Sequence, residues 1–159
     1  MRLTSFSDYT LRVLMYLALD DDRRATIPEI TAAYGISENH LKKVVHHLAR
    51  AGVVESVRGK GGGLTLAVPA NMIRIGDIVR ASEGPAPFVE CLSDDDNTCR
   101  ITRVCRLRGV LVEGLEAMYA RLNRYTLADL VAAPKPQLVA LTRRPLEARP
   151  LRIRTKARD

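Results

Sequence analysis

The chain has 159 residues and carries 25 Lys and Arg against 18 Asp and Glu, a formal net charge of +7. It contains no run of about 18 apolar residues, which excludes a membrane-spanning helix, and its N-terminus lacks the apolar stretch of a signal peptide, so we expect a cytoplasmic protein. The segment from Lys135 onward holds eight basic and two acidic side chains, and therefore +6 of the net charge. The total charge thus does not by itself indicate a nucleic-acid partner for the rest of the chain.

Three helices are predicted within the first 52 residues. Apolar residues recur at helical spacing over residues 8–19, and Thr26-Ile27-Pro28-Glu29 is a capping box that begins a second helix. Ser37 is the expected N-cap of a third helix, whose apolar residues fall at i, i+3, i+4 and i+7, namely Leu41, Val44, Val45 and Leu48. Only residues 34–36 separate the last two helices, which therefore form a helix-turn-helix.

A glycine-rich hairpin is predicted directly after the helix-turn-helix. Residues 53–57 and 64–67 have the pattern of strands, and the segment between them permits a tight basic tip, Arg58-Gly59-Lys60-Gly61-Gly62-Gly63. The rival interpretation is a phosphate-binding nucleotide loop. That loop would open a helix and carry Lys-Ser or Lys-Thr, whereas this chain continues as a strand. A helix-turn-helix followed by a basic hairpin predicts a winged helix.

The predicted DNA-contact residues lie on the second helix of the helix-turn-helix and on the wing. Those on the solvent face of the helix are Glu38, Asn39, His40, Lys42, Lys43 and His46. Residues near the helix N-terminus are expected to reach base edges and the lysines to contact phosphates, while Arg58 and Lys60 approach the minor groove. The alternative for the two lysines is an ordinary solvated helix face.

The only three cysteines fall in one fifteen-residue window. Cys91, Cys99 and Cys105 have the spacing C-x7-C-x5-C, and the residues between the first two are mostly polar. An odd number of cysteines in a cytoplasmic chain argues against a disulfide framework. Three thiolates on one loop suit a soft metal or an iron–sulfur cluster, with a fourth ligand from elsewhere.

Other interpretations of the cysteines stay open. They could be ordinary free thiols. A structural zinc site is disfavoured because neither a C-x2-C nor a C-x4-C pair occurs. An electron-carrying iron–sulfur protein or an enzyme is disfavoured because the sequence has no nucleophile–base pair, and we expect no catalytic activity.

The C-terminal part is predicted to hold an oligomerisation element and a tail. A short helix over residues 75–81 precedes the cysteines, and a long helix over 105–123 carries an apolar stripe that suits a dimer, although it could fold back on its own domain. The predicted fold class is mainly α with a small β-hairpin. Its parts are a winged-helix domain, a cysteine-rich loop, a dimerisation helix with a short terminal helix, and a basic, disordered tail, over residues 1–83, 84–104, 105–131 and 132–159.

Several unrelated segments of the chain match one known family in the same order. They are LTSFSDY at 3–9, VRGKGGG at 57–63, IRIGD at 73–77, CRL at 105–107 and YTLADL at 125–130. Together they resemble the dimeric winged-helix iron–sulfur regulators that include NsrR, IscR and RirA, and most of all the nitric-oxide-sensing NsrR group. The resemblance covers residues 1 to about 131.

The resemblance implies a homodimeric repressor that binds a palindromic operator in double-stranded DNA. It implies an iron–sulfur cluster, [4Fe-4S] or alternatively [2Fe-2S], held by Cys91, Cys99 and Cys105, with Asp8 of the partner subunit as the fourth ligand. Damage to the cluster by nitric oxide would release the DNA. The alternative function is a sensor of iron or cluster supply. From the sequence alone, Asp8 also fits a first-turn carboxylate that complements the helix dipole.

Two features depart from the family pattern. The first cysteine spacing is long, with Asp94-Asp95-Asp96 as the extra length. IscR-like members carry a histidine three residues after the third cysteine, where this chain has Arg108. The second departure favours the NsrR-like interpretation.

Overall fold

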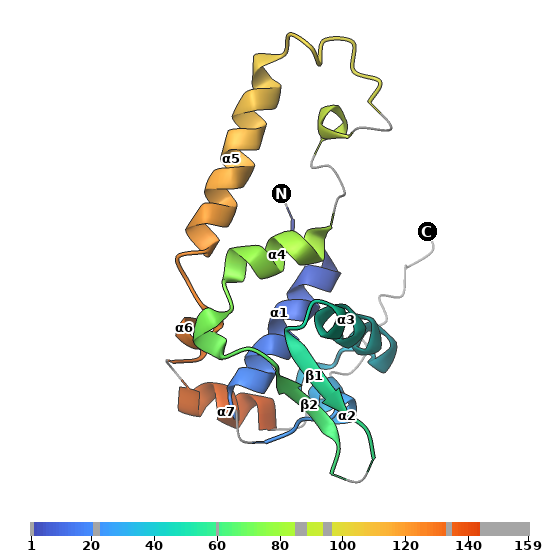
Figure 1. Ribbon diagram of the computed structural model, residues 1–159, viewed down its shortest axis with the longest axis vertical. Coiled ribbons are helices and arrows are strands. Elements are labelled where there is room, and N and C mark those ends of the chain that lie inside the picture. The colour runs from blue at the N-terminus through green and yellow to red at the C-terminus, as the bar shows by residue number, and fades with distance from the viewer. Residues whose placement is uncertain are drawn as a thin grey trace, which may run out of the picture.

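The computed structural model describes residues 2–20, 23–59, 61–84, 89–93, 97–132 and 135–143. A two-stranded hairpin is set among helices, which confirms the predicted fold class. In chain order the elements are α1 (Ser5–Ala18), α2 (Ile27–Tyr34), α3 (Glu38–Arg50), β1 (Val54–Val57), β2 (Gly63–Leu66), the 3-10 turn η1 (Ala70–Met72), α4 (Ile75–Glu83), the 3-10 turn η2 (Glu90–Leu92), α5 (Arg106–Leu122), α6 (Leu127–Ala132) and α7 (Lys135–Arg143). In Figure 1, α5 projects away from a head formed by the other helices and the hairpin.

Side-chain caps fix where the N-terminal helices begin. Thr26 and Glu29 form the predicted capping box of α2, and Ser37 accepts the backbone N–H of His40 at the start of α3. The helix predicted over residues 8–19 begins earlier, at Ser5, because the Thr4 hydroxyl accepts the N–H of Ser7. Gly35 ends α2 in the left-handed conformation, with φ 64°, which turns the chain into α3.

The hairpin packs beside the helix-turn-helix as a wing. Its strands pair antiparallel, with Val54 opposite Leu66 and Val57 opposite Gly63. A bridge that the sequence did not predict extends it: Ala25 and Leu64 exchange backbone hydrogen bonds of 3.0 and 2.7 Å. The loop before α2 is thereby joined to the wing.

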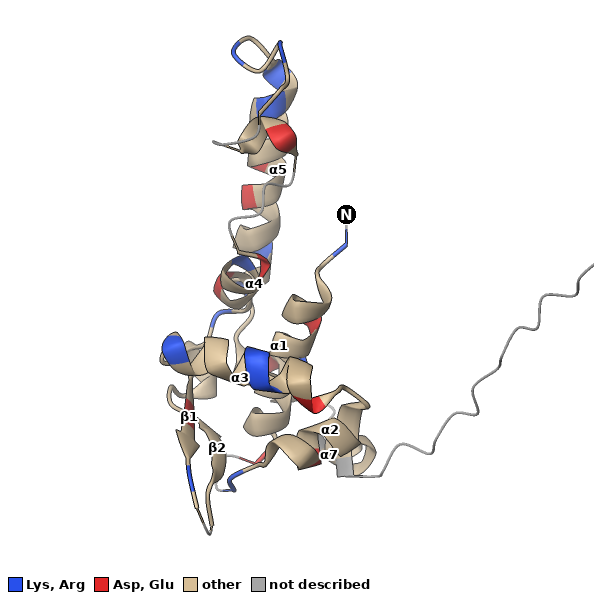
Figure 2. Cartoon of the chain, turned by 90° about the vertical axis from the view of Figure 1, so that its right-hand side faces the viewer, with Lys and Arg blue, Asp and Glu red and all other residues tan. Residues whose placement is uncertain are grey.

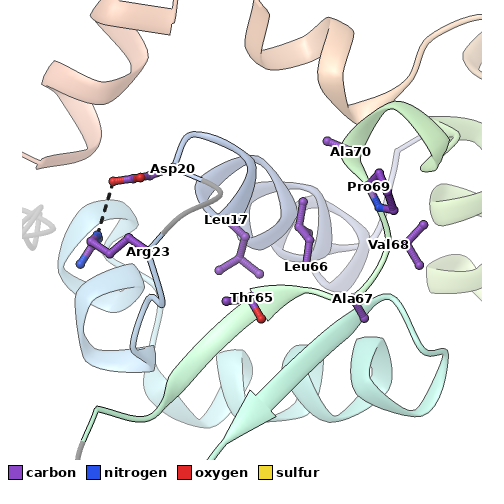
Figure 3. A pocket seen from close by; sticks show the side chains of 9 residues that line it. All are labelled: Leu17, Asp20, Arg23, Thr65, Leu66, Ala67, Val68, Pro69 and Ala70. Carbon is purple, nitrogen blue, oxygen red and sulfur yellow. Dashed lines mark ion pairs between the residues drawn. The ribbon is translucent and has the colours of Figure 1, made fainter.

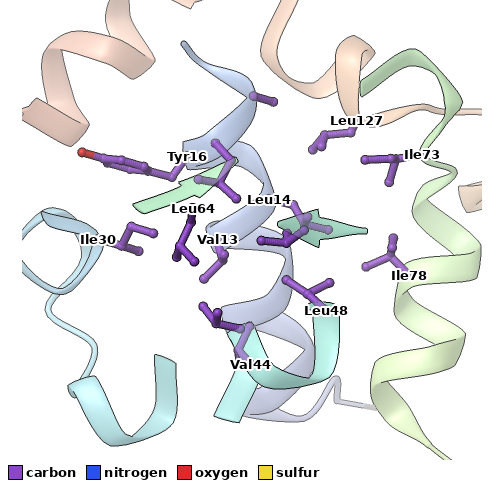
Figure 4. Close-up of a cluster of buried hydrophobic side chains, with 14 of the residues drawn as sticks. Val13, Leu14, Tyr16, Ile30, Val44, Leu48, Leu64, Ile73, Ile78 and Leu127 are labelled. Atoms are coloured by element: carbon purple, nitrogen blue, oxygen red, sulfur yellow. The ribbon is translucent and has the colours of Figure 1, made fainter. Parts of the chain in front are cut away.

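One hydrophobic core unites the head (Figure 4). Its fully buried side chains include Leu14 of α1, Leu41 and Leu48 of α3, and Leu127 of α6. Burial of each such leucine contributes roughly 1.5–3 kcal/mol relative to exposure. Although the sequence grouped the short terminal helix α6 with the dimerisation helix, α6 packs into this core.

The base of α5 is fixed to α4 through the IGD motif. A Cβ at Gly76 would collide with the carbonyl oxygen of Tyr119, so only glycine allows this approach. The Asn123 amide accepts the backbone N–H of Asp77 at 2.9 Å and donates to its carboxylate at 2.7 Å. These contacts set the angle at which α5 leaves the head.

The predicted disordered tail is partly a helix. Residues Lys135–Arg143 form α7, where Pro136 falls in the first turn and so removes no helical hydrogen bond. Leu138 and Val139 pack against the core, and α7 lies on α2 and α6. The prediction of disorder is therefore wrong for these residues. Two adjacent apolar side chains dock the helix on the surface of the head, although they form no long apolar pattern in the sequence. Residues 144–159 lie outside the described part of the chain.

Within the described ranges, no helix is both long and apolar enough to cross a membrane.

Candidate DNA-binding surface and cysteine segment

The predicted recognition helix, α3, presents its polar residues to solvent. All six predicted contact residues of α3 are exposed: Glu38, Asn39, His40, Lys42, Lys43 and His46. Lys42 pairs with Glu38 at 3.1 Å, so its charge is partly offset, whereas Lys43 forms no ion pair with another described residue. Figure 2 marks basic residues in blue on α3, on the hairpin and at the far end of α5.

Two aromatic residues of α1 hold α3 in place. The ring centroids of Phe6 and His47 lie 5.4 Å apart, and those of Tyr9 and His40 lie 5.8 Å apart. The His40 ring is also within 3.0 Å of the Ser37 hydroxyl. These roles of Phe6 and Tyr9 could not be predicted from the sequence, because a helical apolar pattern does not show which partner each residue contacts.

The wing tip depends on glycine and on a distant arginine. Gly59 and Gly61 have φ of 93° and 77°, a region that other residues seldom adopt. Arg24, from the loop before α2, donates to the carbonyl of Gly61 at 3.1 Å and adds a cation to the tip. Arg58 is exposed, as predicted, and Lys60 lies outside the described residues. No local pattern signals Arg24, which is 37 residues away in sequence.

We call residues 89–93 together with 97–105 the cysteine segment; it lies at the end of α5 far from the hairpin (Figure 1). Cys91 is in η2, Cys99 precedes a turn, and Cys105 is the N-cap of α5. All three thiols are free and half-buried. Asp94, Asp95 and Asp96 lie outside the described residues.

Hydrogen bonds join the parts of this segment. The Thr98 hydroxyl donates to Glu90 at 3.2 Å, and Arg108 Nε donates to the carbonyl oxygen of Cys91 at 2.9 Å. Asn97 accepts the backbone N–H of Cys99 at 3.1 Å. All of these bonds are exposed to solvent, so each adds little to global stability.

The donor types fit an iron–sulfur cluster, but one chain does not complete a site. Three thiols on one segment are the ligands that such clusters prefer. Among the described residues, however, no group of three or more His, Cys, Asp and Glu side chains is gathered closely enough to hold a metal ion. A complete site therefore needs movement of the segment, a further chain, or both.

Asp8 lies in the first turn of α1 and does not join the cysteines of its own chain. Its carboxylate makes two contacts with Arg12, of 3.0 and 2.9 Å, and the side chain is 46% exposed. The Arg12 guanidinium also lies 5.8 Å from the centre of the Tyr34 ring on α2. An exposed pair of this kind is weak, so other ligands can compete for Asp8.

The cysteine segment follows a junction between α4 and α1. Glu83, at the end of α4, accepts the backbone N–H of Thr4 at 2.9 Å, and the buried hydroxyls of Ser82 and Ser7 are 2.9 Å apart. Partial burial raises the pKa of the Glu83 carboxyl, but hydrogen bonds from Ser7 and Thr4 outweigh it and leave the pKa below its ordinary value. The start of α1 is thus tied to the end of α4.

A separate cavity of about 330 Å³ lies between the end of α1 and the chain that follows β2 (Figure 3). Its lining includes Leu17, Leu66 and Pro69. Arg23 at its edge pairs with Asp20 at 3.7 Å and with Glu29 at 2.7 Å, so its charge is offset. None of the predicted site residues lines this cavity.

Comparison with known proteins identifies a family of transcriptional regulators. Residues 3–133 match the model of the Rrf2 family, described as an iron-dependent transcriptional regulator. CymR, the global cysteine regulator of B. subtilis, is 28% identical, with a TM-score of 0.65 over 83% of this chain and 97% of CymR. IscR of T. potens is 26% identical, with a TM-score of 0.67 over 83% and 87%. The oxidized form of CymR from Staphylococcus aureus is 27% identical, with a TM-score of 0.64 over 82% and 95%.

Proposed function

Because the chain belongs to the Rrf2 family of transcriptional regulators, we propose that it is a homodimeric repressor whose iron–sulfur cluster senses nitric oxide. Members of this family bind DNA and are typically dimeric. The observation that carries the finer proposal is the set of three free thiols, Cys91, Cys99 and Cys105, on one segment at the start of α5.

The residues that would hold the cluster are these three cysteines and Asp8 of the partner subunit. We propose [4Fe-4S], with [2Fe-2S] as the alternative. When bound, the cluster would supply iron that reacts with nitric oxide. Asp8 is suited to an exchangeable role because a carboxylate is a harder ligand than a thiolate. Among the described residues, its carboxylate pairs only with Arg12, in an exposed ion pair that a cluster could displace.

The surface of α5 supports dimerisation through its N-terminal half. Leu107 and Val110 are each 60% exposed, and Val104 just before the helix is 82% exposed. Leu115 and Met118, nearer the other end, pack against the head of the same chain. The two predictions for this helix are therefore compatible: one half folds back, and the other half offers an apolar face to a second copy.

Contacts within the head suggest how cluster state reaches DNA. Asp8 lies on α1, which holds α3 through Phe6 and Tyr9. We propose that engagement of Asp8 by the partner's cluster sets the position of α1 and hence of α3. In the DNA-bound state the exposed residues of α3 would face the major groove, and the wing would lie at the adjacent minor groove of a palindromic operator.

The alternative is a sensor of iron or cluster supply. It is favoured by the family description, which names iron dependence. Arg108 replaces the histidine of IscR-like ligation, which favours the nitric oxide signal instead.

The two signals are separated by exposing anaerobically purified protein to each of them. Iron and sulfide are quantified first, and cluster loss is then followed by visible absorbance during titration with nitric oxide and, separately, with an iron chelator. We expect nitric oxide to consume the cluster at near-stoichiometric amounts while the chelator acts slowly. Rapid loss to the chelator with little reaction to nitric oxide would favour the iron-supply sensor. A colourless, zinc-containing protein would contradict both.

A further inference from the structure

Arg108 connects the turn that carries Cys91 to the helix that begins after Cys105. It lies in the first turn of α5, three residues after the N-cap Cys105. Its Nε donates to the carbonyl oxygen of Cys91 at 2.9 Å, across 17 residues of sequence. The start of α5 and the turn that carries Cys91 are therefore held together by one guanidinium.

A second hydrogen bond joins the residues beside Cys99 to the turn that carries Cys91. Thr98, next to Cys99, donates to Glu90, next to Cys91, at 3.2 Å. The Glu90 carboxylate therefore joins two parts of the cysteine segment. Arg108 therefore joins α5 to the turn that carries Cys91 by a hydrogen bond. Glu90 in turn joins the Cys91 turn to the residues beside Cys99 by a second hydrogen bond.

We propose that Arg108 is a positioning residue that holds Cys91 beside Cys105 before a cluster binds; this rests on the proposed function. No described residue of the cysteine segment is buried, so hydrophobic packing does not order it. A segment ordered before binding loses less conformational entropy when three of its side chains capture one ligand. Arg108 suits this role because its planar guanidinium has several N–H donors in fixed directions. A lysine has a shorter side chain that ends in a compact ammonium group.

Arg106 provides a matched control. It is exposed and lies in the same turn of α5, and its side chain makes no hydrogen bond or ion pair with another described residue. Arg106→Gln therefore removes the same charge without removing the contact to Cys91.

The proposal is tested first on reduced protein without a cluster. In a Cys99→Ser background, dibromobimane bridges Cys91 and Cys105, and its rate is divided by the rate of single alkylation with monobromobimane. Arg108→Gln is expected to lower this ratio about threefold to tenfold, Arg108→Lys to lower it less, and Arg106→Gln to change it by less than about twofold. Equal ratios for Arg108→Gln and Arg106→Gln would overturn the proposal.

The second measurement uses protein that carries its cluster and intact cysteines. Decay of the cluster in a chelator is expected to be about threefold or more faster for Arg108→Gln than for Arg106→Gln. Faster decay with an unchanged bridging ratio would overturn positioning in favour of a charge effect. If wild-type protein takes up no cluster, the proposed function fails, while the bridging ratio still decides the role of Arg108. Circular dichroism checks that both variants keep their helices.

Discussion

The head and the cysteine segment are held by different forces. The head buries side chains such as Leu14 and Leu41 completely, whereas no described residue of the cysteine segment is buried. Exposed hydrogen bonds, such as that of Arg108 to Cys91, order the segment instead. The head should therefore fold without metal, while the segment has a conformation that a ligand can change. The proposed sensor role requires this difference, because the DNA-contact surface must stay folded while the cysteine segment changes conformation.

The largest expected effect is a difference in stability loss between a core substitution in the head and the same substitution in the cysteine segment. Leu14→Ala should lower the free energy of unfolding by about 2–5 kcal/mol, because a fully buried leucine leaves a cavity in the core. Leu92→Ala makes the same chemical change in the half-buried cysteine segment and should cost less than about 1 kcal/mol. Urea denaturation of protein without a cluster measures both. Similar losses for the two variants would show that the segment is as firmly packed as the head.

The next prediction concerns the reading surface of the head. Arg58→Ala should weaken binding to the cognate operator by about 1–3 kcal/mol if the wing enters a minor groove. Lys43→Ala should weaken binding to all sequences alike and reduce the salt slope by about one. Binding is measured by fluorescence anisotropy at several salt concentrations. Unchanged affinity for both variants would mean that DNA is bound elsewhere.

Two truncations separate the helix α7 from the charged residues after it. Removal of residues 144–159, which carry six basic and two acidic side chains, should modestly weaken binding to any DNA and leave stability and specificity unchanged. Removal of residues 135–159 also deletes Leu138 and Val139 from the core and should lower the free energy of unfolding by about 1–2 kcal/mol. Thermal unfolding and sedimentation measure the outcome. Loss of the dimer on the shorter truncation would contradict the assignment of dimerisation to α5.

The smallest expected effect lies at the junction between the two regions. The pKa of Glu83 is lowered in the folded state, so its contribution to stability is present above the unfolded pKa and is lost as pH falls through the folded pKa. Because Glu83 is half-buried and its hydrogen bonds to Thr4 are exposed to solvent, this contribution is under about 1 kcal/mol. Glu83→Gln should flatten the decline of stability below about pH 5 relative to wild type. If stability fell with equal slope in both proteins, the Glu83 carboxylate would not contribute to the pH dependence of stability.

The sequence predicted the head far better than the cysteine segment. The capping box at Thr26, the N-cap at Ser37 and the apolar stripe of α3 are local patterns, and each formed as predicted. The family match confirms the interpretation as a transcriptional regulator rather than an enzyme.

The unpredicted features depend on contacts between residues far apart in sequence. The bridge from Ala25 to Leu64, the contact from Arg24 to Gly61 and the docking of α7 have no local signature. The cysteine spacing predicts thiolate ligands but does not determine their geometry, because the contacts that order the segment, such as that of Arg108 with Cys91, join residues far apart in sequence. The roles of Asp8 and of the predicted DNA-contact residues stay predictions.

The proposed function requires that the state of the cluster controls operator binding. Operator affinity of the anaerobically prepared, cluster-containing protein is measured at fixed salt before and after addition of nitric oxide, with Cys99→Ala treated in parallel. We predict that nitric oxide weakens specific binding by about tenfold or more in wild type, and that Cys99→Ala binds weakly both before and after. Wild-type protein that keeps its affinity after losing its cluster, or Cys99→Ala that binds as tightly as cluster-containing wild type, would show that the cluster does not control DNA binding.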